Sequence, residues 1–186
     1  ASRHGAGGAG TVGGRQAACA EATSQDPRQA DFRHRNRGTS LILYVDTSAL
    51  LKVYVDEEGS ALVRERVGQA VGLATSAITY VEAHSALARR RHAGDLSPND
   101  YRKAVWELSE GWERYHRLAV GDAVLGEAAR LAKAHLLRAC DAIHLGSAVL
   151  LRSRLQADVT LASWDDELDA AAAREGLQLL RPRRRR

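Results

Sequence analysis

The sequence predicts an α/β fold, a three-layer arrangement with a mainly parallel sheet of about five strands and helices on both faces. Two observations support this prediction. Short apolar segments typical of strands alternate with longer segments whose apolar residues recur at helical spacing. The first strand segment, residues 41–45, is apolar at every position, as expected for a strand buried on both faces of a parallel sheet. No internal repeat is visible in the 186 residues, so we expect one domain.

The elements follow in order from apolar spacing and cap residues. Ser97-Pro98-Asn99-Asp100 is typical of a helix start, because Ser can cap a helix, Pro fits its first turn and an acid follows three residues after the cap. The predicted elements are strand 41–45, helices 47–55 and 60–70, strand 71–75, a helix capped by Ser76 that contains Ile78 to Ala88, a helix from Ser97 to about Tyr115, strand 118–120, helices 122–137 and 140–155, strand 158–162, helix 165–174 and strand 177–180.

Charge is distributed unevenly along the chain, whose formal net charge is +4. Residues 1–40 carry a net charge of +3, residues 181–186 carry +5, and residues 41–180 carry −4. The first segment also holds 7 of the 16 Gly and few aliphatic residues, so we expect a flexible, disordered N-terminal extension. Residues 41–180 are then the folded domain, and residues 181–186 an arginine-rich solvated tail.

Several classes of protein are disfavoured by composition. Two cysteines, Cys19 and Cys140, are too few for a disulfide framework or a cysteine-based zinc site. No stretch approaches the roughly 18 consecutive apolar residues of a membrane-spanning helix, and the N-terminus lacks the apolar core of a signal peptide. We therefore expect a soluble, cytoplasmic protein with reduced thiols and no membrane contact.

Four acidic residues are candidates for a functional site. Asp46 ends the first strand and Asp165 follows the strand that ends at Ala162, and ligands of open α/β sheets bind at this end of the strands. Glu82 and Asp141 lie in helices among largely apolar neighbours, where a carboxylate is costly unless it is paired or binds a metal. All-oxygen ligation favours Mg²⁺ or Mn²⁺ over zinc. Such ions support in-line phosphoryl displacement, so the pattern suggests phosphodiester hydrolysis.

Four segments carry a family resemblance as well. The chain resembles PIN-domain ribonucleases, especially the VapC toxins of bacterial toxin–antitoxin pairs, over about residues 41–180. The motifs stand in the family's order and at its usual spacing: YVDTSALL at residues 44–51, SAITYVE at 76–82, CDAIHL at 140–145 and LASWDDEL at 161–168.

The resemblance implies a fold, an activity and a set of site residues. It implies a PIN-like parallel sheet of about five strands, a Mg²⁺-dependent endoribonuclease, a homodimer, an RNA substrate and a VapB-type antitoxin that covers the site. By position, the expected metal ligands are Asp46, Asp141 and Asp165, with Glu82 completing the acidic cluster. The supporting hydroxyl residues are Thr47 and Ser48, which could hold the first carboxylate or a metal-bound water, and Ser163.

Several alternatives stay open at this stage. The doublet Asp165-Asp166 leaves the fourth acid uncertain by one residue, and the spacing to Leu168 favours Asp165. Each of the four acids could instead be a helix cap or an exposed helix residue. His144 lies three residues after Asp141 and could face the site, although a packed or surface role is the simpler interpretation.

Two other functions compete with the nuclease. A phosphatase that forms an aspartyl-phosphate on Asp46 ranks low, because that chemistry usually needs an Asp two residues later and Ser48 stands there. A non-catalytic RNA-binding module with the same fold is the second alternative.

Overall fold

The sheet is five-stranded, all-parallel and central to the molecule. A computed structural model describes residues 41–181. The expectations for residues 1–40 and for the tail beyond Arg181 lie outside this range. The strand order is β3-β2-β1-β4-β5, with parallel pairing throughout, as the sequence predicts. The strands are β1 (Ile42–Val45), β2 (Gly72–Ser76), β3 (His116–Leu118), β4 (Thr160–Ala162) and β5 (Gln178–Leu179).

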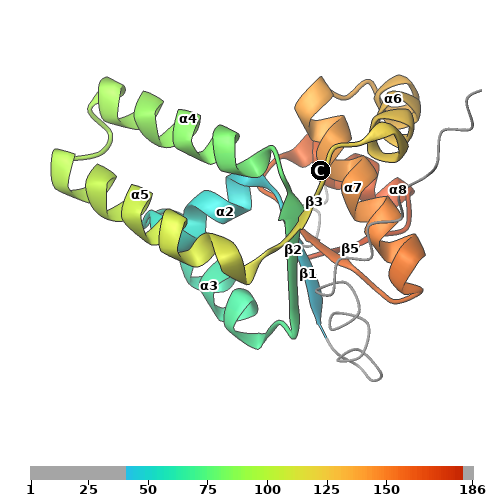
Figure 1. The fold of residues 1–186 in the computed structure, drawn as a ribbon, viewed down its shortest axis with the longest axis horizontal. Coiled ribbons are helices and arrows are strands. Elements are labelled where there is room, and N and C mark those ends of the chain that lie inside the picture. The colour runs from blue at the N-terminus through green and yellow to red at the C-terminus, as the bar shows by residue number, and fades with distance from the viewer. Residues whose placement is uncertain (1–40, 182–186) are drawn as a thin grey trace, which may run out of the picture.

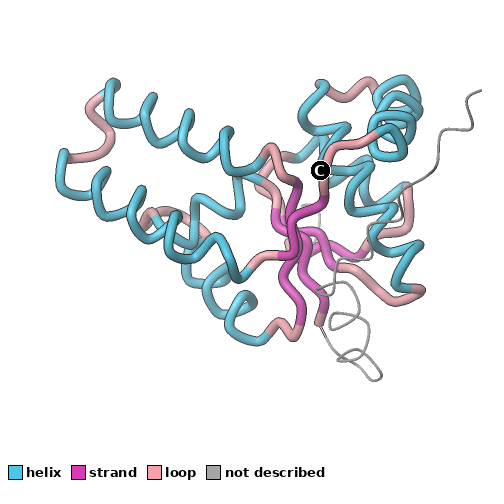
Figure 2. Tube along the Cα trace, viewed as in Figure 1, coloured by secondary structure: helices cyan, strands magenta, loops and turns pink. Residues whose placement is uncertain are grey.

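Helices cover both faces of the sheet, which confirms the predicted three layers (Figures 1 and 2). One face carries the helices of the first half of the domain and the other face carries those of the second half. The first group is α2 (Thr47–Tyr54), α3 (Ser60–Gln69), α4 (Thr79–Ala93) and α5 (Pro98–Gly111); the second is α6 (Asp122–His135), α7 (Ala139–Leu155) and α8 (Asp166–Arg174). In Figure 1, α4 and α5 run side by side and extend away from the sheet.

Strand β1 belongs to both halves of the core. Leu43 and Val45 pack with the residues of α2 to α5, and Ile42 and Tyr44 pack with the residues of α6 to α8. All four side chains are buried, because a central parallel strand has helices over both of its faces. This explains why the strand is apolar at every position.

Two predicted elements differ from the structure. Ser76 does not cap a helix; it ends β2, its hydroxyl is buried without a hydrogen-bond partner among the described residues, and α4 begins three residues later without a side-chain cap. Helix α5 ends at Gly111 rather than near Tyr115, and a 3₁₀ turn over Trp112–Arg114 follows. Because this turn allows the chain to re-enter the sheet early, β3 lies two residues before its predicted position.

The other boundaries agree to within one or two residues. The predicted cap of α5 is confirmed, since the Ser97 side chain accepts from the backbone N–H of Asp100. No single helix in residues 41–181 is long and apolar enough to cross a membrane. Helices α6 and α7 meet the length and composition requirement only as a pair, with a bend of 116° between them.

Candidate active site

The carboxyl ends of β1 and β4 lie side by side and create the site. Val45 is opposite Ala162 in the parallel register, and the Asp46 N–H donates to the Ala162 carbonyl at 3.1 Å. The next residues of both strands, Asp46 and Ser163, therefore leave the sheet at the same edge. Because Asp46 also precedes α2, its carboxylate caps that helix by accepting from the Ala49 N–H at 2.8 Å.

Two predicted hydroxyl residues hold Asp46. The Ser48 hydroxyl lies 2.8 Å and 2.9 Å from the two carboxylate oxygens of Asp46, to which it donates, and it accepts from the Trp164 N–H at 2.8 Å. Ser48 thereby ties the loop after β4 to the end of β1. The Ser163 side chain also hydrogen-bonds Asp46 and accepts from the Asp165 N–H at 3.0 Å.

The charges of Asp46, Asp141 and Asp165 interact across this edge. Burial raises the pKa of Asp46, although His144 and the hydrogen bonds from Ala49 and Ser48 oppose the shift. The pKa of Asp141, in the first turn of α7, is also raised, by burial first and then by the negative charges of Asp165 and Asp46. The fold thus brings Asp46 and Asp165 within electrostatic range of Asp141.

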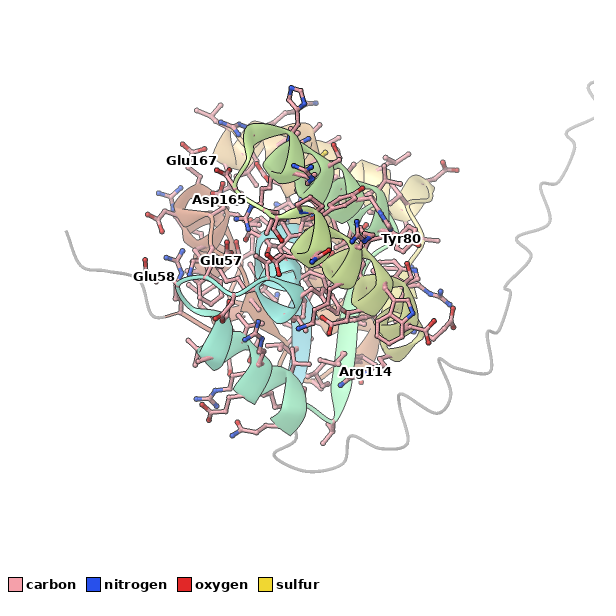
Figure 3. All side chains as sticks on the ribbon, turned by 90° about the vertical axis from the view of Figure 1, so that its left-hand side faces the viewer. Glu57, Glu58, Tyr80, Arg114, Asp165 and Glu167 are labelled. Atoms are coloured by element: carbon pink, nitrogen blue, oxygen red, sulfur yellow. The ribbon has the colours of Figure 1, made fainter. Side chains whose placement is uncertain are left out.

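Asp165 has a structural role as well as a place in the site. Its Oδ1 caps α8 by accepting from the N–H groups of Glu167 and Leu168 at 2.8 Å and 2.9 Å. Asp165 and Glu167 lie close together in Figure 3, on the same side of the molecule as Glu57. Asp166, the other member of the doublet, is exposed and pairs with Arg181 at 2.9 Å. Of the two residues of the doublet, Asp165 and not Asp166 is among the charges that shift the pKa of Asp141.

Glu82 occupies a different part of the site from the three aspartates. Its Oε2 accepts from the Thr47 hydroxyl at 2.5 Å and lies 2.8 Å from His144 Nε2. Burial alone would raise the pKa of Glu82, but the hydrogen bonds from His144 and Thr47 bring it down to about 2. The sequence led us to expect that Thr47 would hold the Asp46 carboxylate or a metal-bound water. In the structure its hydroxyl donates a hydrogen bond to Glu82 instead.

His144 is the functional candidate that sequence reasoning undervalued. Its side chain is 3% exposed, and its ring lies between Glu82 and the Tyr44 hydroxyl, which is 3.2 Å from Nδ1. The only sequence signal was the spacing of three from Asp141, which places both side chains on one side of α7. Tyr44 could not be recognised, because its contact with His144 spans 100 residues.

The carboxylate oxygens of the three aspartates are chemically suited to bind a hard divalent cation. Carboxylate oxygens are the ligands that Mg²⁺ and Mn²⁺ prefer, and the mutual repulsion felt by Asp141 is what a bound cation would relieve. Among residues 41–181, however, no three His, Cys, Asp or Glu side chains lie close enough together to hold a metal ion as they stand. Ligation would therefore require the aspartate side chains to turn toward a common point.

Comparison with known proteins decides the family. The family model described as the PIN domain matches residues 43–174, which is most of the chain and nearly all of the described part. The chain belongs to the PIN-domain family. This PIN domain is 28% identical over 138 residues to Ribonuclease VapC45 of Mycobacterium tuberculosis (strain CDC 1551 / Oshkosh), a match that covers 74% of the chain and 94% of that protein.

Solved structures agree on the fold of this PIN domain. PAE2754 from Pyrobaculum aerophilum superimposes with a TM-score of 0.55 at 23% identity, covering 75% of this chain and 84% of that one. VapBC2 from Rickettsia felis, solved with a DNA fragment from its promoter, gives a TM-score of 0.53 at 12% identity and covers 75% of this chain and 97% of that one. The comparisons confirm the PIN-like fold that the sequence motifs imply.

Proposed function

We propose that this PIN domain is a metal-dependent endoribonuclease and the toxin of a VapBC-type toxin–antitoxin pair. The observation that carries the proposal is the electrostatic effect of Asp46 and Asp165 on Asp141 at one edge of the sheet, where burial raises the pKa of both Asp46 and Asp141 and repulsion by the other two aspartates adds to the shift of Asp141. Perturbed carboxyl groups gathered in this way are typical of functional sites. The similarity to a protein named as a VapC ribonuclease supports the choice of RNA as substrate.

In the proposed phosphodiester hydrolysis, the site residues have different roles. Asp46, Asp141 and Asp165 would hold the cation, and Ser48 and the Ala49 N–H fix the orientation of the Asp46 carboxylate. A bound Mg²⁺ or Mn²⁺ supplies an activated water and neutralises charge on the phosphate. Glu82 keeps its negative charge at neutral pH, because His144 and Thr47 hydrogen-bond its ionised form.

The partners of the chain follow from the same proposal. VapBC2 and FitAB are described as a complex on promoter DNA and a complex on the IR36 DNA fragment, which supports a VapB-type antitoxin as the partner of this chain. A homodimer and a cytoplasmic location are the remaining parts of the proposal. The described residues offer no single membrane-spanning helix.

The phosphatase alternative has less support than the nuclease. An aspartyl-phosphate mechanism needs a nucleophilic oxygen on Asp46, and both of its oxygens lie within hydrogen-bond distance of the Ser48 hydroxyl. A second acid two residues on is absent, because Ser48 occupies that position. The non-catalytic RNA-binding module predicts binding of RNA without cleavage, so it is tested together with the nuclease.

Charge removal at the site tests the proposal. Asp46→Asn and Asp165→Asn should each lower the RNA cleavage rate by at least about 10²-fold, while the folded state is kept, because Asn remains a good helix cap. Asp166→Asn is the matched control, since Asp166 is exposed next to the site, and it should cleave at the wild-type rate. Undiminished cleavage by Asp46→Asn, or RNA binding without cleavage by the wild type, would refute the nuclease.

A further inference from the structure

The buried side chain of His144 contacts Glu82, the one of the four predicted acids that is not a proposed metal ligand. His144 lies on α7, and its Nε2 is 2.8 Å from Glu82 Oε2 on α4, which packs on the opposite face of the sheet. On the other side of the ring, Nδ1 is 3.2 Å from the hydroxyl of Tyr44 on β1. Three elements that are far apart in sequence therefore meet at one imidazole ring.

The partners of the ring determine its protonation pattern. The ionised carboxylate of Glu82 can only accept, so Nε2 must carry a proton. The Tyr44 hydroxyl lies 3.2 Å from Nδ1, and a phenol can donate to a ring nitrogen that carries no proton. A neutral imidazole with its proton on Nε2 satisfies both neighbours at once.

The contact also fixes one particular oxygen of Glu82. Thr47 and His144 both contact Oε2, and the Thr47 hydroxyl lies 3.3 Å from His144 Nε2, so the three groups form a closed triangle. The Oε1 atom is outside this triangle. Since the Glu82 side chain is 26% exposed and the His144 side chain only 3%, the histidine supports the carboxylate from the protein interior.

We propose that His144 is a positioning residue for Glu82, held in its Nε2–H tautomer by Tyr44, and that it presents the Glu82 carboxylate to the acidic site in one fixed orientation. This proposal rests on the nuclease activity proposed above for its functional consequence. It assigns no contact between His144 and the substrate.

Cleavage by the full chain under Mg²⁺ tests the proposal with two variants of His144. His144→Leu fills a similar volume without a donor, and should lower kcat on the order of 10- to 100-fold, the usual effect of removing a group that orients a catalytic residue, with KM little changed. His144→Gln keeps an N–H donor and should recover part of the rate. The matched control is His135→Leu, because His135 on α6 makes a similar contact, at 2.7 Å, with Glu175, the residue after α8, and this variant should leave kcat unchanged.

A double variant separates positioning from a general loss of structure. If His144 acts through Glu82, His144→Leu should cause no further loss of kcat in a Glu82→Gln background. An equal loss in both backgrounds, or a wild-type kcat for His144→Leu, would overturn the proposal. Thermal unfolding of every variant identifies losses that come from instability.

A spectroscopic measurement decides the proposal even if the wild type cleaves no RNA, in which case only the proposed function fails. The ¹⁵N shifts of the His144 ring should show the Nε2–H tautomer in the wild type, and Tyr44→Phe should weaken this preference. A proton found on Nδ1 alone in the wild type would overturn the assignment of His144 as the donor to Glu82.

Discussion

At the scale of single residues, Asp169 is a buried acid that the proposed chemistry does not use. It lies on α8, 4% exposed, and pairs with Arg181 at 3.0 Å. Its pKa is raised to about 7, mainly by burial, with Asp46 and Asp166 adding to the shift and Arg181 opposing it. The buried ion pair with one arginine therefore does not compensate for the cost of removing the carboxylate from water.

This raised pKa predicts a pH dependence of stability. The folded state binds the Asp169 proton more tightly than the unfolded state, so the contribution of Asp169 to the free energy of unfolding is largest below about pH 4 and is lost as the pH rises to about 7. Asp169→Asn cannot ionise and should gain stability relative to the wild type at about pH 8 compared with about pH 4. Urea unfolding in the presence of a chelator measures the difference; an equal difference at both pH values would contradict it.

At the scale of elements, the loop between β4 and α8 is held by the ring of Trp164. Lys52 and Arg181 lie 4.8 Å and 5.3 Å from the centre of this ring, and Gly59, at the start of α3, lies so close that an added Cβ would overlap the ring. This loop also carries Ser163 and Asp165. The packing of a tryptophan between α2, α3 and the C-terminal segment thus sets the position of two site residues.

Two glycine variants can distinguish the effect of the Trp164 contact on stability and cleavage from the effect of backbone strain. Gly59 and Gly94 have almost the same left-handed conformation, with φ of 88° and 87°, but a Cβ on Gly94 would meet nothing within 4 Å. Gly94→Ala should cost only the backbone strain, roughly 1–2 kcal/mol, and leave RNA cleavage unchanged. Gly59→Ala should cost more and also reduce cleavage, because Trp164 must move. Chemical unfolding and cleavage rates measure both effects, and equal behaviour of the two variants would show that the Trp164 contact has no role.

Most elements were predictable, because their signals are local. The continuous apolar segment of β1 and the Ser97 cap of α5 each lie within a few residues, and the structure agrees with both. The predicted cap at Ser76 was wrong because the same residue also extends a buried strand, and pairing of β2 with β1 and β3 outweighs the cap preference. Secondary structure that depends on such competition cannot be read from one segment.

At the scale of the whole molecule, the fold gathers residues that are distant in sequence. Three of the predicted acids come from the end of β1, the start of α7 and the start of α8, and they interact electrostatically in the folded chain. The placement of Asp46 and Asp165 at one edge was predictable, because parallel strands end at a common edge. Asp141, on α7, was expected there from the family resemblance. The partners of Glu82 were not predictable from the sequence. Glu82 hydrogen-bonds with His144 and Thr47 rather than with the aspartates, and this contact depends on how α4 and α7 approach each other from opposite faces of the sheet.

The net charge of the folded domain also supports the proposal that the site binds a metal cation. Residues 41–180 carry a net charge of −4, although the whole chain is basic. An acidic domain with repelling carboxylates is a poor surface for a polyanion such as RNA. The positive charge that brings the phosphate to the site is therefore expected to come from a bound metal ion.

The most direct measurement is RNA cleavage by the full chain after removal of divalent ions with a chelator and after return of Mg²⁺. The account predicts no cleavage in the chelator, recovery of cleavage with Mg²⁺, and no recovery in Asp141→Asn, whose carboxylate is one of the three that interact at the site. Cleavage that persists in the chelator, or Mg²⁺-dependent cleavage by Asp141→Asn at the wild-type rate, would contradict the account.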